Sequence, residues 1–197
     1  MTPLQKSLYR SILALFVAIG LLGCGKKQTL HTITVEEFAE FVEATGYQTD
    51  AEKFGWSIVQ KTVYEYDVVN GSTWRLPNGK DVPRPNDPVT QVSYNDALAY
   101  CEWAGTTLPD YEQYWEAAKD DQRGIVMNNT QILPVADVNV VGNTWDITTT
   151  RNFGGEIRLA GGSYLCAPST CNGTDPERTL FVSADTGNTH ISFSVFR

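Results

Sequence analysis

Turn-forming and loop-forming residues are so frequent in this sequence that only three segments suit helices. These run from the capping box Thr34-Val-Glu-Glu37 to Gly46, from Ser93 to Gly105, and from Asp110 through Lys119. The rest is rich in Gly, Pro, Asn, Asp and Thr, with short apolar runs that are typical of strands, at 61–69, 131–141, 157–165, 178–183 and 190–196. Few helices and many loops predict an α+β domain with short antiparallel strands, whose loops carry the function.

The N-terminal residues predict a lipoprotein signal peptide. Lys6 and Arg10 precede the apolar run 11–22, which is shorter than the roughly 20 residues that span a bilayer. The run ends in Leu21-Leu22-Gly23-Cys24, and this pattern favours cleavage before Cys24 and lipid attachment to it. An uncleaved membrane anchor is the alternative. We expect a signal peptide over 1–23, a tether over 24–33 and one domain over 34–197, anchored by lipid in the cell envelope.

The charge balance narrows the choice of partners. The formal net charge is −8 and the sequence pI is about 4.7, and no basic patch is visible, which argues against a nucleic-acid partner. Charged residues make up 19% of the chain and aromatic residues 11%, which is typical of a globular domain rather than of a disordered one. We expect a monomer with an aromatic-rich core.

Several motifs follow one another in a fixed order. The longest is PVTQVSYNDALAYCEWAG over Pro88–Gly105, and the others are FVEATGY from Phe41, WRLP from Trp74, VGNTWD from Val141, GGSYLCAPSTC from Gly161 and DTGNTHISF from Asp185. In this order they resemble the formylglycine-generating enzyme (sulfatase-modifying factor) family over nearly the whole expected domain. The resemblance implies the compact α+β fold of that family, which has little regular secondary structure and is related to the C-type lectin fold.

The pair Cys166 and Cys171 is the first candidate site. In an oxidising envelope, two lone neighbouring cysteines favour a disulfide, whereas two soft thiolates suit Cu(I). The resemblance implies that both cysteines bind copper, with Ser163 and Trp145 beside them. Both interpretations stay open, because an oxidised pair is the resting form of many redox sites. Cys101, at core spacing on the second predicted helix, is expected to be a buried free thiol.

The second candidate site is a calcium site that the resemblance implies. Its ligands would be Asn139, Gly142, Thr144 and Asp146, where Asp146 replaces the usual Glu. A polar turn that hydrogen-bonds to itself is the alternative. The two histidines, His31 and His190, do not make a zinc site and are interpreted as structural or solvated.

The chain also departs from the family pattern. The link between Lys119 and Asn139 is short where the family has a long insertion that carries another calcium site. Thr170 replaces a Tyr, and the residues after Cys171 lack the Arg-Tyr-Arg stretch of the family. Ser192-Phe193-Ser194 replaces the terminal Gly-Phe-Arg.

Two classes of function follow. The first is a copper-dependent, oxygen-using oxidoreductase that converts a protein or peptide cysteine to formylglycine and so activates sulfatases, with structural Ca²⁺ nearby. The second is a non-catalytic surface lipoprotein that uses the same fold to bind a ligand or protein. A third, less favoured reading is a different oxidation chemistry, as in periplasmic relatives that serve siderophore maturation.

Overall fold

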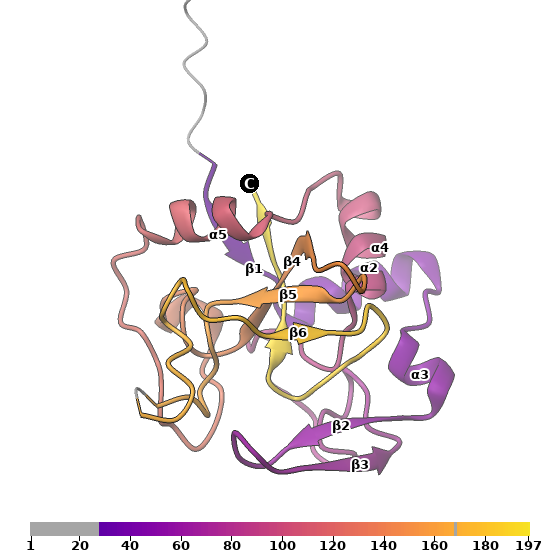
Figure 1. Ribbon diagram of the computed structural model, residues 1–197. Coiled ribbons are helices and arrows are strands. Elements are labelled where there is room, and N and C mark those ends of the chain that lie inside the picture. Colours follow the sequence, from indigo (N-terminus) through magenta and orange to yellow (C-terminus); the bar gives the residue numbers. More distant parts are fainter. Residues whose placement is uncertain (1–27, 168) are drawn as a thin grey trace, which may run out of the picture.

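The computed structural model describes residues 28–167 and 169–197. The expected signal peptide and the lipid site Cys24 lie outside the described residues, so both stay predictions. Among the described residues, no helix is long and apolar enough to cross a membrane. Figure 1 places helices α4 and α5 toward one end of the molecule and the hairpin β2–β3 at the other, with strands β4, β5 and β6 between them.

The three predicted helices are present with the expected ends. They are α2 (Val35–Thr45), α4 (Tyr94–Ala104) and α5 (Tyr111–Ala118). Each begins with a capping box, in which the side chain of Thr34, Ser93 or Asp110 accepts a hydrogen bond from the third residue of the helix. A further helix, α3 (Asp50–Phe54), was not predicted, because five residues are too few for an apolar repeat. A 3₁₀ turn, η2, covers Val135–Asp137.

The strands form one larger sheet and two strand pairs. The larger sheet has the order β6 (Phe181–Val182), β5 (Ile157–Ala160), β4 (Trp145–Arg151) and β7 (Ile191–Ser192). Strand β4 is antiparallel to β5 and parallel to β7, so the C-terminal segment lies beside the Trp145 end of β4. The pairs are β1 (Leu30–Thr32) with β8 (Ser194–Phe196), and β2 (Trp56–Gln60) with β3 (Tyr66–Asn70).

Several segments differ from the sequence prediction, and one of them is 131–141, which forms no strand and contains only the turn η2. The expected tether over 24–33 includes β1, which pairs with the last strand, so the folded domain begins before residue 34. Only the hydrogen bonds to β8 make Leu30–Thr32 a strand, and so short a segment carries no pattern of its own. The strand expected over 61–69 is instead the turn and second strand of a hairpin, because Lys61 and Thr62 donate backbone hydrogen bonds back to Glu65.

The core is aromatic, as the composition predicts. The Phe38 ring lies 5.3 Å from the ring centroids of Phe41 and Trp74, and the Tyr100 ring lies 5.4 Å from that of Phe193. These contacts join α2, α4 and the C-terminal segment, and the sheet adds buried aliphatic residues: Ile147, Ile157, Leu159 and Ile191. Cys101 is a buried free thiol, which confirms the expectation for it. Edge-to-face pairs of this kind add roughly 0.5–1.5 kcal/mol beyond the area that they bury.

Candidate functional site

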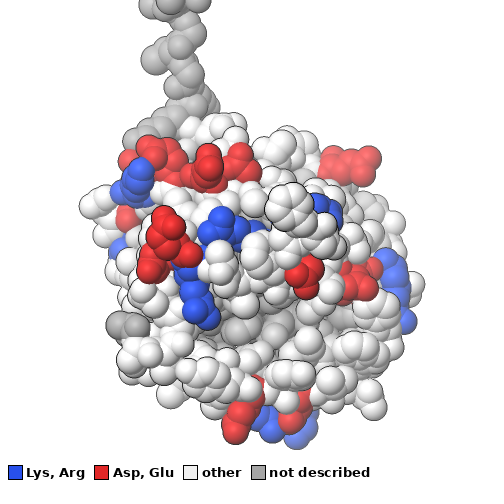
Figure 2. Space-filling view, viewed as in Figure 1, with Lys and Arg blue, Asp and Glu red and all other residues white. Residues whose placement is uncertain are grey.

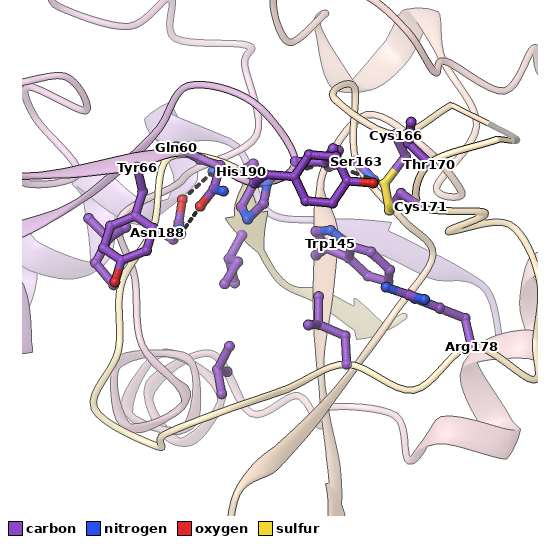
Figure 3. A pocket seen from close by; sticks show the side chains of 16 residues that line it. Gln60, Tyr66, Trp145, Ser163, Cys166, Thr170, Cys171, Arg178, Asn188 and His190 are labelled. Carbon is purple, nitrogen blue, oxygen red and sulfur yellow. Dashed lines mark hydrogen bonds between the residues drawn. A yellow bond between two sulfur atoms is a disulfide. The ribbon is translucent and has the colours of Figure 1, made fainter.

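A cavity of about 340 Å³ opens at the junction of the hairpin β2–β3, the start of β4, the cysteine loop and the C-terminal segment. Figure 3 shows Gln60 and Tyr66 of the hairpin on one side of it and Cys166 and Cys171 on the other, with Trp145, Ser163 and His190 between. Polar and apolar side chains therefore surround a sulfur pair in a space that can admit a peptide side chain.

A pair of glycines shapes the loop that carries the cysteines. Gly161 and Gly162 have φ of 86° and 79°, in the left-handed region that favours glycine. A Cβ atom at Gly162 would lie 2.8 Å from the Cα atom of Gly173, because the two arms of the loop cross there. The Cys166 amide then donates to the Ser163 carbonyl at 2.9 Å. The Gly-Gly-Ser sequence thus allows a compact loop that holds both cysteines at one end of the cavity.

The structure joins Cys166 and Cys171 in a disulfide, with Cα atoms 5.0 Å apart. Cys166 has no exposed surface, whereas 8% of Cys171 is exposed. Both residues line the cavity, so opening of the disulfide would release two sulfur donors in one place. This donor set fits Cu(I), which accepts two soft thiolates. No group of three or more His, Cys, Asp and Glu side chains that could hold a metal occurs in the described part of the chain, so the fit involves these two sulfurs alone.

Ser163 and Trp145 lie where the sequence analysis expects them, beside the cysteine pair. The Ser163 side chain is fully buried, and its Oγ lies 3.9 Å from the Sγ atom of Cys166. The Ser163 amide also points at this sulfur, with an N–S distance of 3.5 Å. Trp145 begins β4, and its amide donates to the His190 carbonyl at 2.8 Å, which fixes the indole in the cavity wall.

His190 is the site residue that sequence reasoning missed. We interpreted it as structural or solvated, but its ring lines the cavity and its Nδ1 lies 3.3 Å from Ser163 Oγ. Burial lowers the pKa of His190 to about 4, so the imidazole is neutral at pH 7. The sequence signal for His190 is its place in the C-terminal motif. In the structure the next residue of that motif, Ile191, pairs with Trp145.

The expected calcium ligands are engaged within the protein. The Asn139 amide donates to the carbonyls of Asp121 and Arg123 at 2.7 and 3.1 Å, and its Oδ1 accepts from the Val141 amide. Asp146 Oδ2 accepts from the Tyr114 hydroxyl at 3.1 Å.

The other oxygen of Asp146 is the feature that suits a cation. Asp146 Oδ1 is buried and accepts no well-aligned hydrogen bond among the described residues, although Ser194 lies near this carboxyl. Burial raises the pKa of the carboxyl to about 7. Either a proton or a cation on this oxygen would remove the cost of burying its charge. The remaining two expected ligands, Gly142 and Thr144, would contribute only backbone carbonyls. Calcium binding therefore stays a prediction.

Charges are mixed over the outer surface. Figure 2 shows acidic and basic side chains interspersed on the face that it presents, with no continuous basic patch there. Arg178 lines the cavity, where Figure 3 shows it beyond Trp145.

Comparison with known proteins identifies the family. The model of the sulfatase-modifying factor enzyme 1-like domain matches residues 29–154, more than half of the chain. The chain belongs to this family. The match begins at β1, in agreement with the earlier start of the folded domain, and it ends before Ser163, Cys166 and Cys171.

Curated relatives carry names for active and inactive proteins. The formylglycine-generating enzyme of Mycobacterium tuberculosis is 29% identical over 83% of this chain and 84% of its own length. That of Thermomonospora curvata is 42% identical over 45% of this chain, but the match spans only 35% of that relative. The inactive Cα-formylglycine-generating enzyme 2 of Bos taurus is 34% identical over 48% of this chain and 38% of its own length. Family membership therefore leaves catalysis open.

Solved structures confirm the expected fold. PvdO from Pseudomonas aeruginosa superposes with a TM-score of 0.59 over 84% of this chain and 77% of its own, at 14% identity. At this identity the likeness concerns the fold alone.

Proposed function

We propose that the protein oxidises the side chain of a cysteine in an exported protein or peptide and so converts it to formylglycine in a sulfatase-like client. The observation that carries this proposal is the placement of Cys166 and Cys171 in the wall of an open cavity together with Ser163 and Trp145. A disulfide that served stability alone would not need access to a cavity that can hold a side chain. The family relation to proteins named formylglycine-generating enzyme supports the same chemistry.

The cysteine pair would hold the cofactor. After reduction of the disulfide, Cys166 and Cys171 would bind Cu(I) through their thiolates. The bound ion would promote the reaction of the substrate cysteine with oxygen. The Ser163 amide and hydroxyl both point at Cys166 Sγ and would stabilise a thiolate there. Trp145 would exclude water from one side of the pair, because only 2% of the residue is exposed and it lines the cavity.

The opposite wall of the cavity would receive the substrate chain. Tyr64 and Tyr66 of the hairpin are exposed and line the cavity, and exposed tyrosines supply contact area at low conformational cost. Gln60 and Asn188 are hydrogen-bonded to each other at 3.1 Å across the base of the hairpin. They offer amide groups to a peptide backbone. A lipid on Cys24 would restrict the clients to exported proteins.

The test is a turnover assay on the reduced domain. It is loaded with Cu(I) and offered a Cys-x-Pro-x-Arg peptide in the presence of oxygen, and the aldehyde is sought by mass spectrometry. We expect product with the parent protein and with Cys101→Ser, which removes the free thiol outside the cavity. We expect none with Cys171→Ser. The absence of aldehyde from the parent protein, with Cys166 and Cys171 resistant to reduction, would overturn the enzymatic proposal.

A binding protein without catalysis is the second candidate. It is favoured by the closed disulfide together with the chain's relation to proteins named inactive. This proposal predicts that the oxidised protein binds a peptide in the cavity, that Tyr64→Ala weakens binding, and that Cys166→Ser with Cys171→Ser leaves binding unchanged. Fluorescence titration with a labelled peptide measures all three.

A further inference from the structure

A second cavity lies between the first turns of α2 and the segment 74–85. Its volume is about 570 Å³, and it shares no lining residue with the cysteine cavity. Most of its lining is apolar and consists of Val35, Ala39, Trp74, Leu76, Val82, Pro83 and Pro85. We call it the α2 groove. Val82 is 80% exposed, so this apolar surface faces solvent, as is typical of an interaction site.

Hydrogen bonds hold the proline-containing wall of the α2 groove against the helix. The Glu36 amide donates to the Pro85 carbonyl at 2.9 Å. Between the two prolines of this wall, Arg84 Nε donates to the Asp87 carboxylate at 2.8 Å. The rings of Pro83 and Pro85 also fix their own φ angles. A wall that is held in this way loses little conformational freedom when a partner binds.

An acidic stripe runs along the exposed face of α2 beside the groove. Glu36, Glu40 and Glu43 recur at the spacing i, i+4 and i+7, so they lie on one side of the helix. All three are exposed, and none forms an ion pair with another described residue. Glu36 also lines the groove, so the negative charge adjoins the apolar surface. Carboxylates in this arrangement attract a cationic partner and repel an anionic one.

The groove also contains a hydrogen-bond donor that lacks an acceptor. Trp74 is buried, and its Nε1 has no hydrogen-bond partner among the described residues. The Arg75 Cζ atom lies 4.1 Å from the centre of the Trp74 ring, and Arg75 Nε lies 3.9 Å from a carboxylate oxygen of Glu52, which offsets part of its charge. An unpaired buried N–H is costly, so this indole favours a partner that brings an acceptor. The last carbonyls of a helix are unpaired acceptors of this kind.

We propose that the α2 groove is a docking site for a basic amphipathic helix of a partner protein. The apolar side of that helix fills the groove against Trp74 and Val82, and its Lys or Arg side chains pair with the acidic stripe. A helix suits the stripe because its side chains recur at the same spacing of three and four residues. The site goes beyond the proposed function, since it is separate from the cysteine cavity and needs no catalysis there.

Charge decides between this occupant and two others that could cover an apolar groove. A second copy of the chain carries the same formal net charge of −8, and two acidic stripes that face each other repel. A membrane surface with anionic lipids is repelled in the same way. A cationic amphipathic helix complements both the charge and the apolar surface.

The test measures the binding of three fluorescently labelled peptides to the full oxidised protein by anisotropy. The first consists of leucine and lysine with the leucines at helical spacing, and the second has glutamate in place of every lysine. In the third, leucine and lysine alternate strictly, which favours a strand. We expect saturable binding of the first peptide alone, and weaker binding at higher salt. NMR shift changes on binding should be confined to α2 and the segment 74–85.

A matched pair of valine variants tests the apolar wall. Val82→Lys places a positive charge in the groove and should weaken binding of the first peptide by about tenfold or more, because an apolar contact is replaced by an unpaired charge. Val68→Lys makes the same change at an exposed valine of the hairpin β2–β3. Its affinity should match that of the parent protein.

A matched pair of double variants tests the stripe. Glu40→Gln with Glu43→Gln removes two charges beside the groove and should weaken binding by about threefold to tenfold. Glu102→Gln with Glu112→Gln removes the same net charge from exposed positions of α4 and α5. Unchanged affinity in this control separates attraction by the stripe from attraction by the net charge.

Several outcomes would overturn the inference. They are no binding of the first peptide, equal binding of the acidic peptide, and equal affinities within either matched pair. A parent protein that dimerises, or that binds phosphatidylcholine vesicles, and loses this property in Val82→Lys would assign the groove to a second copy or to a membrane instead. None of these results bears on the cysteine cavity, because turnover of the Cys-x-Pro-x-Arg peptide tests that site separately.

Discussion

At the scale of single residues, burial determines which groups of the site are charged. The His190 ring is partly buried in the cavity wall and the Asp146 carboxyl is fully buried, so both lose part of the solvation of their ionised form. Burial therefore lowers the pKa of His190 to about 4 and raises that of Asp146 to about 7. The two shifts have opposite effects on how folding depends on pH.

The His190 shift predicts a loss of stability on acidification. Between about pH 6.5 and pH 4 the unfolded chain binds a proton at His190 that the folded protein does not, so the free energy of unfolding falls as the pH falls. Asparagine at this position does not titrate. We expect His190→Asn to gain about 3 kcal/mol relative to the parent protein between pH 7 and pH 4. Urea unfolding at both pH values measures this difference. An equal pH dependence in the two proteins would show that His190 is solvated.

The Asp146 environment provides a test of calcium binding. A cation on the buried oxygen Oδ1 would remove the cost of ionising this carboxyl. If calcium binds, a concentration one hundred times the Kd should stabilise the parent protein by about 2.7 kcal/mol and raise its Tm. Asp146→Asn should lose this response. If the Tm of the parent protein is the same in calcium and in EDTA, the residues form a polar turn that does not bind calcium.

At the scale of structural elements, short loops with special backbone conformations position the site. Strand β4 brings Trp145 into the cavity wall, and its parallel partner β7 brings the C-terminal segment, with His190, beside it. The cysteine loop crosses itself at Gly162 and Gly173. Gly162 has a left-handed φ, and the crossing leaves no room there for a side chain.

A pair of glycine substitutions separates these two requirements. Gly162 and Gly155 have φ of 79° and 84°, but a Cβ atom meets the Gly173 backbone only at Gly162 and has nothing within 4 Å at Gly155. Gly155→Ala should cost about 1 kcal/mol, the penalty for a left-handed alanine. Gly162→Ala should cost more, by up to about 3 kcal/mol, because the loop must also shift. Urea unfolding measures both, and equal costs would argue against the tight crossing.

At the scale of the whole molecule, the first and last strands of the described residues are joined. Strand β1 pairs with β8 in the register Leu30 with Phe196, His31 with Val195 and Thr32 with Ser194, and Figure 1 shows the C-terminus beside β1. The Thr32 and Ser194 hydroxyls are also hydrogen-bonded at 2.8 Å. The segment that we expected to be a tether is therefore part of the fold.

This pairing predicts a sharp boundary for truncation. A chain that begins at Gln28 keeps β1 and should have the same Tm as one that begins at Cys24. A chain that begins at Thr34 loses β1 and the fully buried Ile33, and should unfold at a Tm lower by several degrees. Circular dichroism melts compare the three. Equal Tm values for the three chains would support the sequence prediction that residues 24–33 are a tether.

Local chemistry was sufficient to predict three helices, α2, α4 and α5, and it missed the five-residue helix α3. The capping boxes at Thr34, Ser93 and Asp110, and the closing glycines, act through hydrogen bonds within a few residues, so the sequence contains the whole interaction. The aromatic core followed from composition in the same way. The resemblance identified Cys166, Cys171, Ser163 and Trp145 as neighbours, and the structure places them around one cavity.

Only the tertiary structure decided what depends on partners far along the chain. Leu30–Thr32 is a strand because β8, more than 160 residues later, supplies its hydrogen bonds. His190 is neutral and faces Ser163 because β7 lies parallel to β4. Neither consequence has a local pattern, since a hydrogen bond between distant strands and the removal of water from a ring are properties of the packed chain. The sequence by itself determined the helices, the fold family and the sulfur pair, and the packed structure decided which residues surround that pair.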